Sequence, residues 1–369
     1  MTRLHQFVQR VLGPKEPKQS VSIGELAGET IAIRPLWRTY KLRWKRRQLL
    51  FRSYRKRREL VSVVDRTRQI RGNAILAFIT VRNEAVRLPF FMEHCRKLGV
   101  DHFLIVDNNS DDGTVDWLGQ QPDVSLWASA DSYKMSRFGL DWLTQLQRIH
   151  GHGHWCLTLD ADEILVYPYW ETRNLHALTE RLETDGRRSF GTLMLDMYPK
   201  GPLSQQHYAA GQDPTKTLNW FDSGNYVVQA QPRMRNLWIQ GGVRARSFFG
   251  TDPRRAPTLN KVPLVKWDRG YAYVNSTHAI LPRTLNAVFD ETGGECLSGI
   301  LLHTKFLPVV IDKSVEEQTR KQHFSNSTLY EGYYRDVIAA PDLWCATSCR
   351  YTGWRQLEAL GLMSRGGWV

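Results

Sequence analysis

Short apolar runs alternate with helix patterns in the first half of the chain, and this alternation limits the possible folds more than any other feature. The apolar runs are residues 74–81 (AILAFITV), 102–106 (HFLIV), 124–128 and 155–159 (WCLTL), and helical spacing is seen at 88–98 and 138–149. Runs of this length are typical of strands buried on both faces. The pattern predicts an α/β fold with a mainly parallel central sheet and a ligand site at the carboxyl ends of its strands.

Polar residues follow three of the predicted strands, at 82–84 (RNE), 107–109 (DNN) and 160–162 (DAD). In extended backbone, residues two apart point to the same side, so Asp160 and Asp162 can face one cation. Carboxylate oxygens suit magnesium or manganese. An isolated Asp-x-Asp after a strand is most often a solvated turn. The two other polar strand ends favour a metal site here.

The order of these segments resembles glycosyltransferase family 2, and specifically its bacterial subgroup with a late LLHxKF element. The resemblance is carried by TVRNE (80–84), LIVDNNSDDGT (104–114), LTLDADE (157–163) and LLHTKF (301–306), and it covers residues 74–307. It implies a GT-A nucleotide-sugar-binding fold over residues 71–312. It also implies an enzyme that transfers a sugar from a nucleotide-sugar donor to a glycan, lipid-linked or polysaccharide acceptor.

The resemblance assigns roles to residues at matching positions. Glu84 and Asp107 correspond to the family's nucleotide contacts. Asp160 and Asp162 correspond to its metal motif, with Asp162 the more direct ligand. A divalent cofactor, manganese or magnesium, is therefore implied.

Two residues of the late element complete the implied site. His303 resembles the histidine that closes the metal or diphosphate site in many GT-A enzymes, and Lys305 is placed to neutralise phosphate charge. On composition alone, both could be ordinary polar residues at a strand end.

Sugar transfer with inversion, which the resemblance implies, also needs a carboxylate as general base for the acceptor hydroxyl. Glu291 and Glu295, in the segment FDETGGECLSG before the late element, are the favoured candidates. Asp196, Asp222 and Asp252 stay open as alternatives.

The basic residues of the chain are concentrated in one segment. Residues 34–71 hold fifteen Lys or Arg against Glu59 and Asp65, which equals the net charge of +13, so the remaining chain is neutral. A neutral body with one basic segment indicates a docking arm rather than a nucleic-acid groove. Residues 37–64 lack Pro and Gly and interleave aromatic with basic residues, as a surface helix does. Packing on the body, contact with an anionic membrane and nucleic-acid binding remain open for this helix, and nucleic acid is the least expected partner.

Domain organisation and compartment follow from broader features. We expect a basic, partly helical extension at residues 1–70, the catalytic domain at 71–312 and a helical C-terminal segment at 313–369. Five scattered cysteines indicate no disulfide framework. No secretory leader or membrane span is recognisable, so we expect a cytoplasmic protein that can lie on the inner face of the membrane.

Three other function classes remain as alternatives. A phosphatase of the haloacid dehalogenase type also carries Asp-x-Asp, but expects Thr or Val where this chain has Ile164. A nucleotidyltransferase would place a Gly-rich loop after the first strand, whereas residues 82–89 contain no Gly. A membrane or nucleic-acid adaptor would use only the basic segment. The stretch GGVRARSF (241–248) could aim two arginines at phosphate or form a turn followed by a strand.

Overall fold

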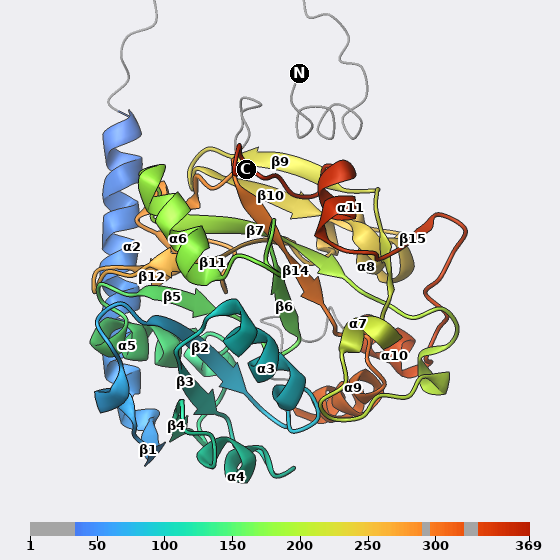
Figure 1. The fold of residues 1–369 in the computed structure, drawn as a ribbon, viewed down its shortest axis with the longest axis horizontal. Coiled ribbons are helices and arrows are strands. Elements are labelled where there is room, and N and C mark those ends of the chain that lie inside the picture. The colour runs from blue at the N-terminus through green and yellow to red at the C-terminus, as the bar shows by residue number, and fades with distance from the viewer. Residues whose placement is uncertain (1–33, 290–295, 321–330) are drawn as a thin grey trace, which may run out of the picture.

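The computed structural model describes residues 34–289, 296–320 and 331–369. At its centre lies a nine-stranded sheet with the order β1-β4-β3-β2-β5-β11-β7-β14-β6 (Figure 1). Its strands are β1 (Val61–Val64), β2 (Ile75–Val81), β3 (His102–Asp107), β4 (Val124–Ala128), β5 (Trp155–Thr158), β6 (Glu163–Val166), β7 (Ser189–Asp196), β11 (Asn260–Lys266) and β14 (Ser298–His303).

Three two-stranded sheets and several helices surround this sheet. The strand pairs are β8 (Trp220–Asp222) with β15 (Ser348–Arg350), β9 (Val227–Gln231) with β10 (Asn236–Gln240), and β12 (Ala272–Tyr273) with β13 (Ile280–Leu281). The helices are α2 (Arg34–Lys56), α3 (Leu88–Leu98), α4 (Thr114–Gly119), α5 (Leu140–His150), α6 (Leu175–Thr184), α7 (Pro214–Thr217), α8 (Gly242–Phe248), α9 (Val309–Arg320), α10 (Glu331–Ile338) and α11 (Trp354–Ala359).

Most strands of the central sheet run in one direction. β4, β3, β2 and β5 pair in parallel, and β7 and β14 pair in parallel. Between these two groups, β11 is antiparallel to both β5 and β7, so the two groups share one direction. Only the edge strands β1 and β6 also run the other way in the described sheet. The predicted α/β fold with a mainly parallel sheet is confirmed.

Helices cover both faces of the parallel half of the sheet. Ile75 and Ala77 of β2 join the core beneath α3 and α6, whereas Leu76 and Phe78 of the same strand join the core beneath α5. Both faces of β2 are therefore buried, which is why its sequence reads as a continuous apolar run. The predicted boundaries at 88–98 and 124–128 match α3 and β4.

The basic segment forms the predicted helix, α2, but that helix ends earlier than residue 64. It stops at Lys56, and the β-branched stretch Val61–Val64 becomes β1, which pairs with β4 at the edge of the sheet. The last part of the extension is thus built into the central sheet. No helix among the described residues is long and apolar enough to cross a bilayer.

The stretch GGVRARSF forms a helix rather than a strand. Gly241 and Gly242 both have positive φ, of 146° and 67°, and α8 starts directly at Gly242. A Cβ at Gly241 would lie 2.4 Å from the carbonyl oxygen of Asn225. Glycine is therefore required at this sharp entry to α8, and the entry sets the direction of the two arginines that follow.

Candidate functional site

The loop that joins β5 to β6 passes over the ends of three strands. β11, β7 and β14 lie between these two strands in the sheet, so residues 159–162 must cross the ends of all three. Asp160 thereby reaches Lys261 at the start of β11, with 3.0 Å between Oδ2 and Nζ. Asp162 reaches His303 at the end of β14, with 3.3 Å between Oδ2 and Nε2. The predicted residues Asp160, Asp162 and His303 therefore lie in one site.

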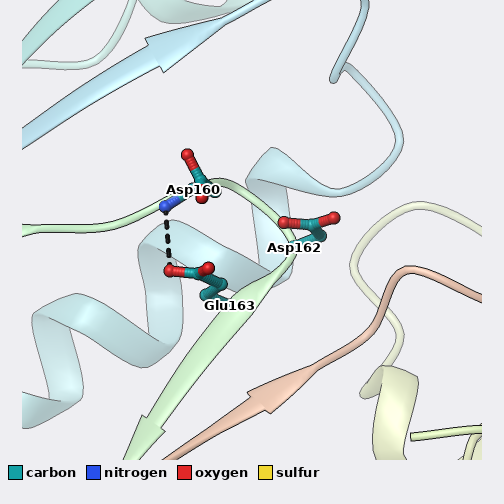
Figure 2. Close-up of side chains that lie close together, drawn as sticks. All are labelled: Asp160, Asp162 and Glu163. Atoms are coloured by element: carbon teal, nitrogen blue, oxygen red, sulfur yellow. Dashed lines mark hydrogen bonds between the residues drawn. The ribbon is translucent and has the colours of Figure 1, made fainter. Parts of the chain in front are cut away.

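Three carboxylates gather at this loop, as Figure 2 shows. Oxygen atoms of Asp160, Asp162 and Glu163 lie within 4.8 Å of one another. The Asp160 side chain is 55% exposed and that of Asp162 22%, whereas Glu163 is only 1% exposed. The backbone amide of Asp160 donates to Glu163, at 3.3 Å. This set of hard oxygen donors fits a divalent cation such as magnesium or manganese, with the two aspartates facing outward.

A buried lysine lies between two of these acids. Lys261 donates to both Asp160 and Glu163. Burial alone would lower the pKa of Lys261, but the two carboxylates outweigh it and raise that pKa, so the lysine stays charged. Burial, with the charges of Asp160 and Asp162, raises the pKa of Glu163 to about 8, even though Lys261 opposes the rise. The lysine therefore acts as a resident cation of the acidic cluster.

His303 connects the cluster to the end of β7. It pairs with Asp196 in the parallel register of β14 and β7, and its Nδ1 lies 2.6 Å from Oδ1 of that aspartate. Burial opposes ionisation of Asp162, but the nearby His303 and Arg87 hold the pKa of Asp162 well below its ordinary value. Burial likewise lowers the pKa of His303, but Asp162 and Asp196 together raise it above its ordinary value.

Two further cations reach the site from other elements. Arg244 of α8 is buried and donates to Asp196 at 2.8 Å, so one of the two arginines of GGVRARSF enters the site. The other, Arg246, instead donates to Asp222. Lys305 also lies in the wall of the site, and burial lowers its pKa to about 8 although Asp162 raises it.

The two predicted nucleotide contacts lie in different settings. Glu84 lines the cavity and is held by Arg87, at 3.0 Å, and by Lys313 of α9. Asp107 is buried and accepts from both the hydroxyl and the amide of Ser110, which closes the turn after β3. Its neighbour Asn108 is the residue of this turn that lines the cavity.

Most of these groups line one cavity of about 680 Å³, namely Glu84, Arg87, Asp160, Asp162, Glu163, Arg244, Lys261, His303, Lys305 and Lys313. This volume is within the range of small-molecule sites. Its described walls carry eight Lys or Arg side chains against five Asp or Glu side chains, so the cavity suits an anionic ligand. Aromatic residues line it as well, among them Tyr133, Phe138 and Trp238.

Each candidate general base that the structure describes is paired with an arginine. Glu291 and Glu295 lie outside the described residues. Of the alternatives, Asp196 is engaged by Arg244 and His303. Asp222 accepts from Tyr198 and Arg246, and Asp252 pairs with Arg254 and Arg255.

Sequence reasoning missed Lys261, Arg87 and Lys313. Lys261 had a recognisable signal, because it is a charged residue inside the apolar run 259–265 (LNKVPLV). A buried lysine needs a partner of opposite charge, so that run indicated an acidic cluster nearby. Arg87 and Lys313 had no such signal, since Arg87 directly precedes α3 and Lys313 lies within α9, and a charged residue is ordinary in both positions.

No protein-family model matches the chain, and no curated protein matches it. Among solved structures, a 4-diphosphocytidyl-2C-methyl-D-erythritol synthase is 18% identical with a TM-score of 0.24. That match covers 38% of this chain and 65% of the synthase, so the chain spans less than two thirds of the synthase's length. A second solved structure is a Bacillus anthracis protein assigned as a glucose-1-phosphate thymidylyltransferase and crystallised with a sucrose. It is 9% identical with a TM-score of 0.28, and the match covers 78% of this chain and 96% of that protein. Scores this low carry no argument about reaction or substrate.

Proposed function

We propose that the protein is a metal-dependent glycosyltransferase that moves a sugar from a nucleotide-sugar donor to a hydroxyl acceptor. The observation that carries the proposal is a cavity in which two outward-facing aspartates lie within a wall of surplus cations. Carboxylates hold a divalent metal, and cations hold the diphosphate of the donor. The residues come from strand ends that the sequence resemblance to family 2 also singled out.

Each charged group has a task in this proposal. Asp160 and Asp162 would hold the divalent ion, which would supply positive charge at the leaving diphosphate. Lys305 and Arg244 would add fixed positive charge to the same region, where negative charge grows as the sugar leaves. His303 holds Asp162 and Asp196 in place through its two ring nitrogens. Glu291 or Glu295 remains the proposed general base for the acceptor, a glycan or a lipid-linked sugar.

The loop after β2 favours this reaction over nucleotidyl transfer. A nucleotidyltransferase binds phosphates through free backbone amides of the loop after its first strand. Here three successive amides are already used: Asn83 donates to Ser110, Glu84 to Thr114 and Ala85 to Asp112. Ser110 and Asp112 belong to the loop after β3 and Thr114 begins α4, and the three distances are 2.9 to 3.0 Å. Phosphate binding is therefore left to the metal and to side-chain cations.

Calorimetric titration of nucleoside diphosphates, with and without manganese, tests the proposal. We expect manganese-dependent binding in the parent and a loss of at least about tenfold in Asp162→Asn, with an unchanged fold because this side chain contributes little to the core. Asp116→Asn, an exposed acid of α4, is the matched control. Equal affinity in Asp162→Asn and the parent would reject the metal assignment.

Product analysis separates the two transfer reactions. Incubation with nucleotide sugars and water or an acceptor sugar should release a nucleoside diphosphate. Nucleotidyl transfer would instead consume a nucleoside triphosphate and a sugar phosphate with release of pyrophosphate. Pyrophosphate as the product would overturn sugar transfer while leaving the metal site intact.

A further inference from the structure

One face of α2 is fixed to the body of the protein. Leu42 and Leu49 are buried against Ala272 and Leu281 of the β12–β13 pair. Arg52 donates to the buried carboxylate of Asp141 on α5, at 2.6 Å. In Figure 1 the helix stands along one side of the molecule. Its rotation about its own axis is therefore set, and the opposite face must point outward.

That outward face carries a stripe of aromatic side chains. Tyr40, Trp44, Phe51 and Tyr54 are all exposed, Trp44 by 54% and Phe51 by 62%. Their spacing of four, seven and three residues keeps them on one side of a helix. Large apolar side chains collected along one exposed helix face are not expected unless something covers them.

The same face is strongly basic. Arg43, Arg47 and Arg55 are exposed, and none forms an ion pair with a residue that the structure describes. Their positions interleave with the aromatic stripe at helical spacing. The helix has ten Lys or Arg and no acidic residue in its 23 positions. The outward face thus combines aromatic rings with arginines that have no counter-charge among the described residues.

We propose that this face of α2 binds an anionic lipid bilayer, with the helix lying parallel to the membrane plane. Aromatic rings enter the region between headgroups and acyl chains, and the arginines beside them meet lipid phosphates. A membrane fits better than a nucleic-acid duplex, because the centre of the stripe is apolar and the phosphate backbone of a duplex offers it no partner. An anionic bilayer offers an apolar layer to the aromatic rings and phosphate groups to the arginines. The inference does not depend on the proposed sugar transfer.

The test is sedimentation of the full-length protein with vesicles of phosphatidylcholine alone or with phosphatidylglycerol. We expect binding only to the anionic vesicles. Charge reversal of Arg43, Arg47 and Arg55 to Glu together should lower that binding at least about 100-fold, since each basic residue near an anionic surface contributes roughly a fivefold factor. A control with the same change in charge on the far side of the molecule should bind as the parent does. That control is Lys216→Glu, Arg335→Glu and Arg350→Glu, on α7, α10 and β15 (Figure 1).

A second variant separates the aromatic contribution from the charge. Trp44→Ser with Phe51→Ser keeps every cation, and both side chains lie outside the core. It should weaken vesicle binding by about tenfold even at high salt, where surface charge is screened. Equal loss in the reversal and control variants, equal binding to neutral vesicles, or a shift with RNA and none with vesicles would each overturn the proposal.

Discussion

Replacement of Lys261 by methionine tests whether the acidic cluster depends on its resident cation. The Lys261 side chain is 4% exposed, and it contacts Glu163, which is 1% exposed, as well as the more open Asp160. Removing one partner of a buried pair costs about 3 to 5 kcal/mol. The lower end of this energy range applies, because solvent reaches Asp160 and because the raised pKa of Glu163 lets that residue keep a proton. We expect Lys261→Met to lower the free energy of unfolding by about 3 kcal/mol.

Lys266→Met on the same strand is the matched control. Lys266 pairs with Glu183 at 3.0 Å, but both side chains are partly exposed. Exposed pairs contribute less than about 1 kcal/mol, so this variant should stay close to the parent. Urea unfolding, followed by tryptophan fluorescence with a chelator present, gives both values. Equal losses in the two variants would refute the reasoning that burial makes the Lys261 contact strong.

Two further predictions rest on the shifted pKa values of a buried histidine and of two cysteines. Burial lowers the pKa of His278 to about 3, while its Nδ1 donates to the carbonyl of Asn260. The unfolded chain therefore binds a proton first as pH falls, and about 2 kcal/mol of stability should be lost between pH 7 and pH 5. Urea midpoints at both pH values should differ less in His278→Asn, and an equal difference would contradict this. A hydrogen bond with Thr347 lowers the pKa of Cys345, whereas burial raises that of Cys95 to about 12. Iodoacetamide followed by mass spectrometry should label Cys345 first in the folded protein, and prior labelling of Cys95 would contradict the burial.

The parallel half of the fold could be predicted because its signals are local. Strands buried on both faces need continuous apolar runs, and Gly99 ends α3 in the left-handed conformation that favours glycine. The end of α2 could not be predicted in the same way. Residues 61–64 become a strand because β4, about sixty residues later, offers them a pairing edge. Helical spacing within the segment contains no information about that distant partner.

The sequence predicted more of the acids of the site than of its cations. Asp160 and Asp162 follow a strand that its apolar run predicts, so topology places them at the edge of the sheet, whereas His303 was assigned from the family resemblance. Lys261 comes from the amino end of β11, which runs against its neighbours, and Arg244 comes from a helix in a stretch for which a turn followed by a strand was one of two alternatives. Strand polarity and the entry angle of α8 depend on tertiary packing.

Under the proposed function, the charges of the site favour joint binding of a metal ion and a diphosphate. Lys261 already lies against Asp160, and His303 lies against Asp162. A divalent ion alone would add positive charge to walls in which cations already outnumber acids by eight to five. A diphosphate alone would bring its own negative charge close to the carboxylates of Asp160 and Asp162. Bound together, the metal would offset the charge of the aspartates and of the diphosphate, and the diphosphate would offset the surplus cations. By linkage, each ligand should increase the binding affinity of the other by the same factor. Calorimetric titrations with manganese and nucleoside diphosphate, carried out in both orders of addition, measure that factor.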